Sequence, residues 1–88
     1  MISFKEMPLN LTDVNGDEYL CFYGDIQWFK TADSRDKENI IEFLAYFKDK
    51  RHPVIISEHE NIKDASEAVQ EFKRDLAKTM SAWREASV

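Results

Sequence analysis

The sequence predicts an α+β fold with the element order β-β-α-β-α. Three observations predict it: an Asn-Gly pair between two apolar runs, an apolar stripe at helical spacing in the middle of the chain, and a longer stripe of the same kind at its end. Hydrophobic residues make up 43% of the 88 residues, which is enough to build a core in one domain over residues 1–88. We therefore expect a three-stranded sheet, formed by an N-terminal hairpin and one further strand, with both helices on one face and a long C-terminal helix.

The Asn15-Gly16 pair predicts a β-hairpin over about residues 4–29. A two-residue type I′ turn needs positive φ at both central positions, and Asn-Gly meets that need. The register of such a loop sets which side chains share a face. On the expected core face lie Leu9, Leu11, Leu20 and Phe22. On the opposite face lie Asn10, Thr12, Tyr19, Cys21 and Tyr23.

The hairpin is expected to change direction near Pro8 and Gly24. Proline has no N–H to donate to a strand ladder, so it is confined to edges and breaks. The same register would also place Glu6 opposite Asp25, and like charges in opposite positions are unfavourable. We therefore expect a bulge or bend at this point.

A first helix is predicted over about residues 34–50. Thr31, Asp33 and Ser34 are candidate N-caps. Its apolar stripe consists of Ile40, Ile41, Leu44 and Phe47. Basic residues follow at the expected C-terminus, where the helix dipole favours positive charge, and these are Lys48, Lys50, Arg51 and His52.

A buried strand over about residues 53–57 and a second helix over about residues 61–86 complete the fold. The strand is the short β-branched run around Ile55. Either Ser57 or Asn61 is suited to cap the helix that follows. The helix has one continuous apolar stripe at steps of three or four, formed by Ile62, Ala65, Val69, Phe72, Leu76, Met80 and Trp83.

Metal-ligand patterns in the sequence are incomplete, so no metal or other cofactor is predicted. The segment that begins at Asp13 resembles the start of a calcium loop, but its sixth position is Glu18 and its twelfth is Gly24. A calcium loop needs glycine at the sixth position and a bidentate carboxylate at the twelfth. The residues Cys21, His52 and His59 lack the paired close spacing of a zinc site.

The sequence does not predict an enzyme. His52 and His59 are candidate acid–base groups, and Cys21 is a candidate nucleophile, but no recognisable spacing connects them. With only two glycines, the chain has no glycine-rich phosphate loop or dinucleotide fingerprint. We expect a protein without catalytic residues.

Charge and cysteine content indicate a soluble protein of a reducing compartment. A lone cysteine cannot form an internal disulfide, which small secreted domains usually need. Neither a signal peptide nor a long uncharged apolar stretch is evident. We therefore expect a cytoplasmic protein without a membrane span. Its net charge of −5 favours a protein partner over a nucleic acid.

Two surfaces are predicted to bind. The first is the acidic hairpin tip with its neighbouring tyrosines, which comprises Asp13, Asp17, Glu18, Tyr19 and Tyr23. The second is the end of the last helix, because about 25 residues span roughly 37 Å and a compact chain of this size is only about 30 Å across. That end would support self-association through Leu76, Met80 and Trp83.

These features favour a non-catalytic protein–protein interaction module. Its small size and acidity suit an inhibitor or antitoxin-like regulator of a nucleic-acid-handling partner, of the type found in phages and mobile elements. The alternative is a homodimeric nucleic-acid-binding regulator that uses the basic residues Lys48, Lys50 and Arg51 at the end of the first helix.

Overall fold

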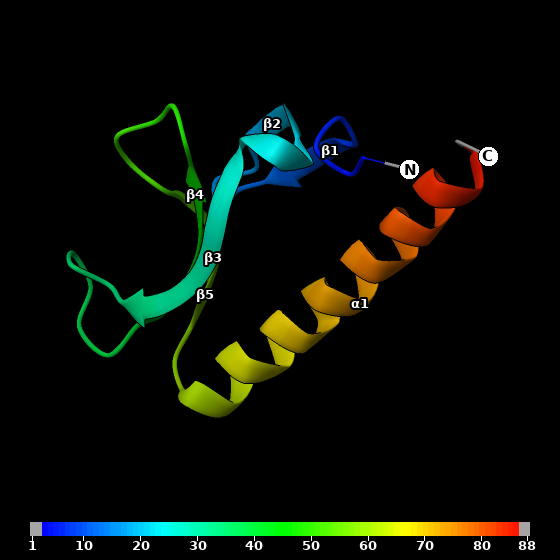
Figure 1. Ribbon diagram of the computed structural model, residues 1–88. Helices are drawn as coiled ribbons and strands as arrows, with labels where there is room; N and C mark the ends of the chain where they lie inside the picture. Colours follow the sequence, from blue (N-terminus) through cyan, green and yellow to red (C-terminus); the bar gives the residue numbers. More distant parts are fainter. Residues whose placement is uncertain (1–2, 87–88) are drawn as a thin grey trace.

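The computed structural model describes residues 3–86 and has five strands and one long helix. In chain order the elements are β1 (Pro8–Thr12), β2 (Glu18–Phe22), the one-turn 3₁₀-helix η1 (Tyr23–Asp25), β3 (Ile26–Asp33), β4 (Ile41–Phe47), β5 (Val54–His59) and α1 (Ile62–Ala86). The α+β class, the three-stranded sheet and the long C-terminal helix are confirmed, whereas the second helix is absent from the described residues (Figure 1).

The three-stranded sheet has the order β3-β4-β5 and is antiparallel throughout. It is formed by three consecutive strands rather than by a hairpin plus one later strand. The predicted hairpin over residues 4–29 is therefore wrong in extent, because β1 and β2 form a separate two-stranded sheet and β3 begins at Ile26. The predicted bend near Gly24 is present, since this glycine lies in η1 between β2 and β3.

The helix predicted over residues 34–50 is wrong, because residues 41–47 form the central strand β4. Both structures accommodate a short apolar run, but this run is rich in aromatic and β-branched side chains that favour a strand. The polar stretch before it forms a turn, in which Asn39 has φ of 58°. The amide of Ser34 donates to the carbonyl of Ile40 at 2.8 Å and closes that turn.

The predicted hairpin register is wrong by one residue. Asn10 lies opposite Leu20 and Leu9 opposite Cys21, so Leu20 and Phe22 point away from the core while Tyr19 and Cys21 point into it. The turn runs from Asp13 to Asp17, and its only positive φ is at Gly16, at 86°. A turn of this kind is longer than a two-residue type I′ loop, and a shift of one residue exchanges the two faces of a strand.

The helix α1 agrees closely with the predicted range of 61–86. Asn61 is its N-cap, because the side-chain oxygen of Asn61 accepts a hydrogen bond from the amide of Asp64 at 2.8 Å. Ser57 instead lies within β5. Within residues 3–86, α1 has no stretch of the length and apolarity that a membrane crossing requires.

The helix and the hairpin share one face of the three-stranded sheet. Alternate residues of β4 point to this face. At one end Phe43 packs against Phe72 of α1, with ring centroids 5.2 Å apart. At the other end Ala45 and Phe47 form the core with residues of the hairpin and β5, which are Leu11, Tyr19, Cys21 and Val54. The helix therefore crosses the sheet at an angle and continues beyond it (Figure 1).

Candidate interaction surfaces

The acidic hairpin tip is organised by one carboxylate. Oδ1 of Asp13 accepts hydrogen bonds from the amides of Asn15 at 2.8 Å and Asp17 at 3.0 Å, and Oδ2 accepts one from the Tyr19 hydroxyl at 3.1 Å. Partial burial raises the pKa of the Asp13 carboxyl, but these donors outweigh burial and hold the pKa below its usual value. Asp13 is thus a structural residue of the turn, and its charge is maintained at neutral pH.

Tyr19 points inward and is not part of an open tyrosine face. It packs against the core cluster, and the ammonium group of Lys50 lies 4.6 Å from the centre of its ring. The hydrogen bond to Asp13, followed by burial and the nearby acidic charges, raises the pKa of its hydroxyl. This orientation follows directly from the one-residue shift in register.

The other residues predicted at this surface are divided between the tip and the base of the hairpin. Asp17 and Glu18 are exposed at the tip. Tyr23 is half-buried in η1 at the opposite end, where its amide donates to the carbonyl of Met7 at 2.8 Å. The structure therefore brings Asp13, Asp17, Glu18 and Tyr19 together but places Tyr23 away from them.

Apolar side chains occupy the outer face of the hairpin. The register predicted from the sequence places these side chains in the core. Leu20 is 83% exposed and Phe22 is 53% exposed, and both point outward from β2. Pro8, which pairs with Phe22, is exposed beside them. We call Pro8, Leu20 and Phe22 the outer hairpin face. Large exposed apolar groups that lie next to one another are typical of binding surfaces.

Comparisons of the chain with known protein families, with curated proteins and with solved structures found no match.

The candidate catalytic and metal-binding residues do not converge. Among residues 3–86, no group of three or more His, Cys, Asp or Glu side chains is placed to hold a metal ion. Cys21 is half-buried against the core. Burial and then the charge of Asp25 raise the pKa of its thiol, which disfavours the reactive thiolate.

One polar pair that sequence reasoning missed lies on β5. The hydroxyl of Ser57 is 2.7 Å from Nε2 of His59, and the spacing of two residues on a strand explains why they share a face. A serine nucleophile also needs a substrate cavity and donors for the developing oxyanion. Neither Ser57 nor His59 lines the principal cavities of the described chain. The pair is therefore explained as a hydrogen bond within the strand.

The basic residues Lys48, Lys50 and Arg51 lie in the β4–β5 turn and not at a helix end. Lys50 is directed back over the rings of Tyr19 and Phe47, at 4.6 Å and 5.1 Å from their centres. The prediction that these basic residues lie at a helix C-terminus and interact with its dipole is consequently wrong. At least one of their charges has a role within the molecule.

The residues proposed for self-association lie along the second half of α1. Leu76 faces the sheet side and lines a groove, and Met80 is half-buried. The indole Nε1 of Trp83 donates to the carbonyl of Ser3 at 3.2 Å. The guanidinium of Arg84 lies 5.5 Å from the centre of the Phe4 ring. The end of α1 therefore contacts the N-terminal segment of the same chain.

Proposed function

We propose that this protein is a non-catalytic protein–protein interaction module that binds through the outer hairpin face and the acidic tip beside it. The observation that carries this proposal is the exposure of Leu20 and Phe22 on one strand face, next to the acidic residues of the turn. Burying a leucine or phenylalanine side chain contributes about 1.5–3 kcal/mol. Two such groups would anchor a partner.

The charge of the tip specifies the chemistry of that partner. Asp13 is held in its ionised form, while Asp17 and Glu18 are exposed next to it. Acidic groups at the border of an apolar patch favour a basic partner surface, because complementary charge increases the association rate and orients the encounter. We propose a basic, nucleic-acid-handling protein as the partner, and an inhibitor or antitoxin-like role of the phage or mobile-element type for this chain.

The experiment is a capture from native lysate on immobilised protein, with two variants in parallel. The double variant Leu20→Ser/Phe22→Ser removes the outer hairpin face. The control Ile62→Ser removes a large apolar side chain that is 74% exposed at the start of α1. A protein retained by the wild type and by the control, lost on the double variant and released by rising salt, is the expected result.

Retention of the same proteins by the double variant would contradict the proposal. Loss of the captured protein by the Ile62→Ser variant alone would show that the binding site includes the start of α1 and not the outer hairpin face. Recovery of nucleic acid instead of protein would favour the alternative regulator. A charge-reversal variant of Lys48 and Arg51 would then be expected to abolish that binding.

Self-association through Leu76, Met80 and Trp83 is a separate proposal. Its support is the amphipathic second half of α1, where aromatic and methionine side chains suit an interface. Trp83→Ala is expected to lower the molar mass in light scattering without changing helix content. A wild-type protein that stays monomeric at high concentration would contradict it.

A further inference from the structure

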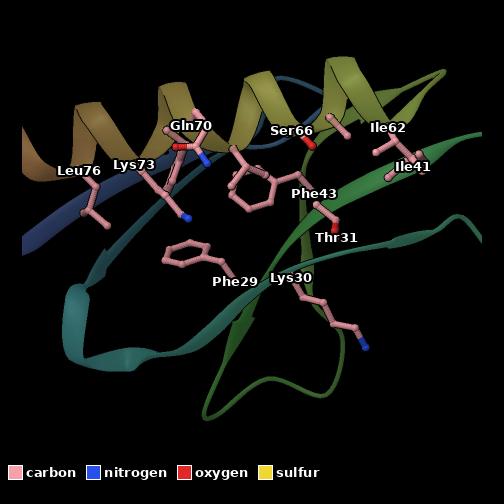
Figure 2. A pocket seen from close by; sticks show the side chains of 13 residues that line it. Phe29, Lys30, Thr31, Ile41, Phe43, Ile62, Ser66, Gln70, Lys73 and Leu76 are labelled. Carbon is pink, nitrogen blue, oxygen red and sulfur yellow. The ribbon is translucent and has the colours of Figure 1, made fainter.

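A second surface is a groove between β3 and α1. The groove has a volume of about 390 Å³. Aromatic and aliphatic side chains from the sheet and the helix form its floor, and these are Phe29, Phe43, Val69, Phe72 and Leu76. Figure 2 shows the rings of Phe29 and Phe43 between the ribbon of α1 and the strands. The groove is separate from the outer hairpin face.

The strand along this groove is an unpaired sheet edge. In the sheet order β3-β4-β5, β3 is terminal, and within residues 3–86 it pairs only with β4. It is eight residues long, which makes it the longest strand of the described chain. The opposite edge is partly covered, because the amide of Val14 in the hairpin turn donates to the carbonyl of Ile55 at 3.0 Å. An open edge presents amide and carbonyl groups that another strand can pair with.

The helix supplies a polar rim above the groove. Ser66, Gln70 and Lys73 lie on the side of α1 that borders it, where Figure 2 shows Lys73 directed down toward Phe29. Lys30 points away from the helix in the same view, onto the other face of the sheet. A strand added to the edge of β3 would therefore have one lysine near each of its two faces.

The charge of this surface differs from that of the whole chain. The chain has 17 Asp and Glu residues against 12 Lys and Arg residues, yet the two charged residues at the groove are both lysines, of which only Lys73 directs its side chain toward it. A second copy of the chain, paired edge to edge through β3 in the register that sets Lys30 opposite Lys30, would bring like charges together, and that contact is unfavourable. An incoming strand with carboxylates on the face of Lys30 would instead be attracted there, with Lys73 as a second positive charge at the border of the groove.

We propose that the groove between β3 and α1 binds an extended peptide segment in which apolar and acidic residues alternate, added as a fourth strand to the sheet edge at β3. Pairing of main-chain groups would provide affinity, and alternate side chains would provide specificity. The apolar side chains would fill the groove over Phe29 and Phe72. The acidic side chains would lie on the opposite face, next to Lys30, with Lys73 available at the border of the groove.

The test uses the full isotopically labelled chain and defined peptides followed by NMR. The probe is a capped peptide of alternating Val and Glu, with the eight-residue length of β3. One control peptide has Lys in place of Glu, and a second carries N-methyl groups that prevent strand pairing. At about 1 mM peptide, where a complex with a Kd of about 1 mM is half-formed, shifts are expected at Phe29, Thr31 and Lys73, with slower exchange of the outward amides of β3.

Matched variants separate charge from shape. The double variant Lys30→Glu/Lys73→Glu is expected to weaken binding of the acidic peptide by about tenfold, because each exposed ion pair contributes a few-fold in affinity. The same variant is expected to bind the basic peptide more tightly than the wild type does. Lys48→Glu with Lys78→Glu changes the net charge equally at lysines outside the groove. This control is expected to alter the affinity by less than about twofold. The variant Leu20→Ser/Phe22→Ser should leave binding unchanged, so failure here and failure of the proposed function are distinguishable.

Four results would overturn the proposal: no shifts at β3, equal binding of the acidic and basic peptides, undiminished binding of the N-methylated peptide, or equal losses in the two lysine variants. A dilution series of the protein alone tests for a fifth result that would overturn the proposal. Shifts at β3 that depend on protein concentration would show that a second copy occupies the edge. Saturation of the groove by laurate, without protection of the β3 amides, would assign it to an amphipathic small molecule instead.

Discussion

The three-stranded sheet and the β1–β2 hairpin use their apolar residues differently. In the sheet, Phe43, Ala45 and Phe47 all point to the face that the helix and the hairpin cover. In the hairpin, Leu11 is buried while Leu20 on the neighbouring strand is 83% exposed. The central strand therefore places these side chains in the core, whereas Leu20 and Phe22 of the hairpin contribute little buried surface. Surface that folding does not require is available for binding.

The largest expected effect comes from removing the side chain that holds the helix on the sheet. The ring of Phe72 lies 4.9 Å from Phe29 and 5.2 Å from Phe43. Phe72→Ala is expected to lower the free energy of unfolding by about 3 kcal/mol, because it removes apolar contacts and leaves a cavity. Urea unfolding measures this change in free energy, and the control is Lys78→Ala, which alters an exposed residue of the same helix. A loss of less than about 1 kcal/mol would show that this cluster does not hold the helix.

The next effect is expected at the joint between the two sheets. A Cβ placed on Gly24 would lie 2.8 Å from the carbonyl oxygen of Lys5, and this is a backbone atom that cannot turn aside. Gly24→Ala is therefore expected to cost about 1–3 kcal/mol through steric strain. A thermal unfolding scan measures the change. Unchanged stability would mean that the N-terminal segment is free to move away from η1.

A smaller effect, dependent on pH, is expected at the hairpin tip. The folded chain holds the pKa of Asp13 below its usual value, so the unfolded chain binds this proton at a higher pH. The stabilisation is complete above the ordinary aspartate pKa of about 3.9 and is lost as the pH falls through the lower folded value. Asp13→Asn should thus be less stable than the wild type at neutral pH. The difference in stability between the two proteins should shrink as the pH falls below the ordinary aspartate pKa, and a difference that stays constant with pH would contradict this.

The smallest effect sharpens the contrast between the two regions. Leu20→Ser and Phe22→Ser are each expected to change the free energy of unfolding by no more than about 0.5 kcal/mol, since neither side chain is buried. Chemical denaturation of the single variants measures this change. A large loss of unfolding free energy in either variant would mean that the outer hairpin face is part of the core and is not a free binding surface.

The fold was predictable where one local signal was unopposed. The stripe from Ile62 to Trp83 has a single period over many turns, and Asn61 precedes it as a cap, so α1 was placed correctly. Residues 41–47 are too short for a period to separate helix from strand. In such a run the outcome depends on neighbouring strands that the sequence does not identify.

The candidate surfaces were harder to predict because they depend on tertiary pairing. Asn15-Gly16 suggested a two-residue turn, but the carboxylate of Asp13 captures two amides and sets a longer one. That single shift decided which face of β2 is exposed. The groove was outside the reach of sequence reasoning, because residues of β3 were assigned to the hairpin and so could not be recognised as a free edge.

The contact between Trp83 and Ser3 has a consequence for the order of folding. It joins positions 80 residues apart, and closing such a loop in an unfolded chain costs roughly 4 kcal/mol. One hydrogen bond contributes only about 0.5–1.5 kcal/mol, so we expect the contact to form only after the rest of the fold has brought the two ends together. In a Trp28→Phe background, the remaining indole would report the last step of folding and the first step of unfolding, at different times from the signals of the sheet itself.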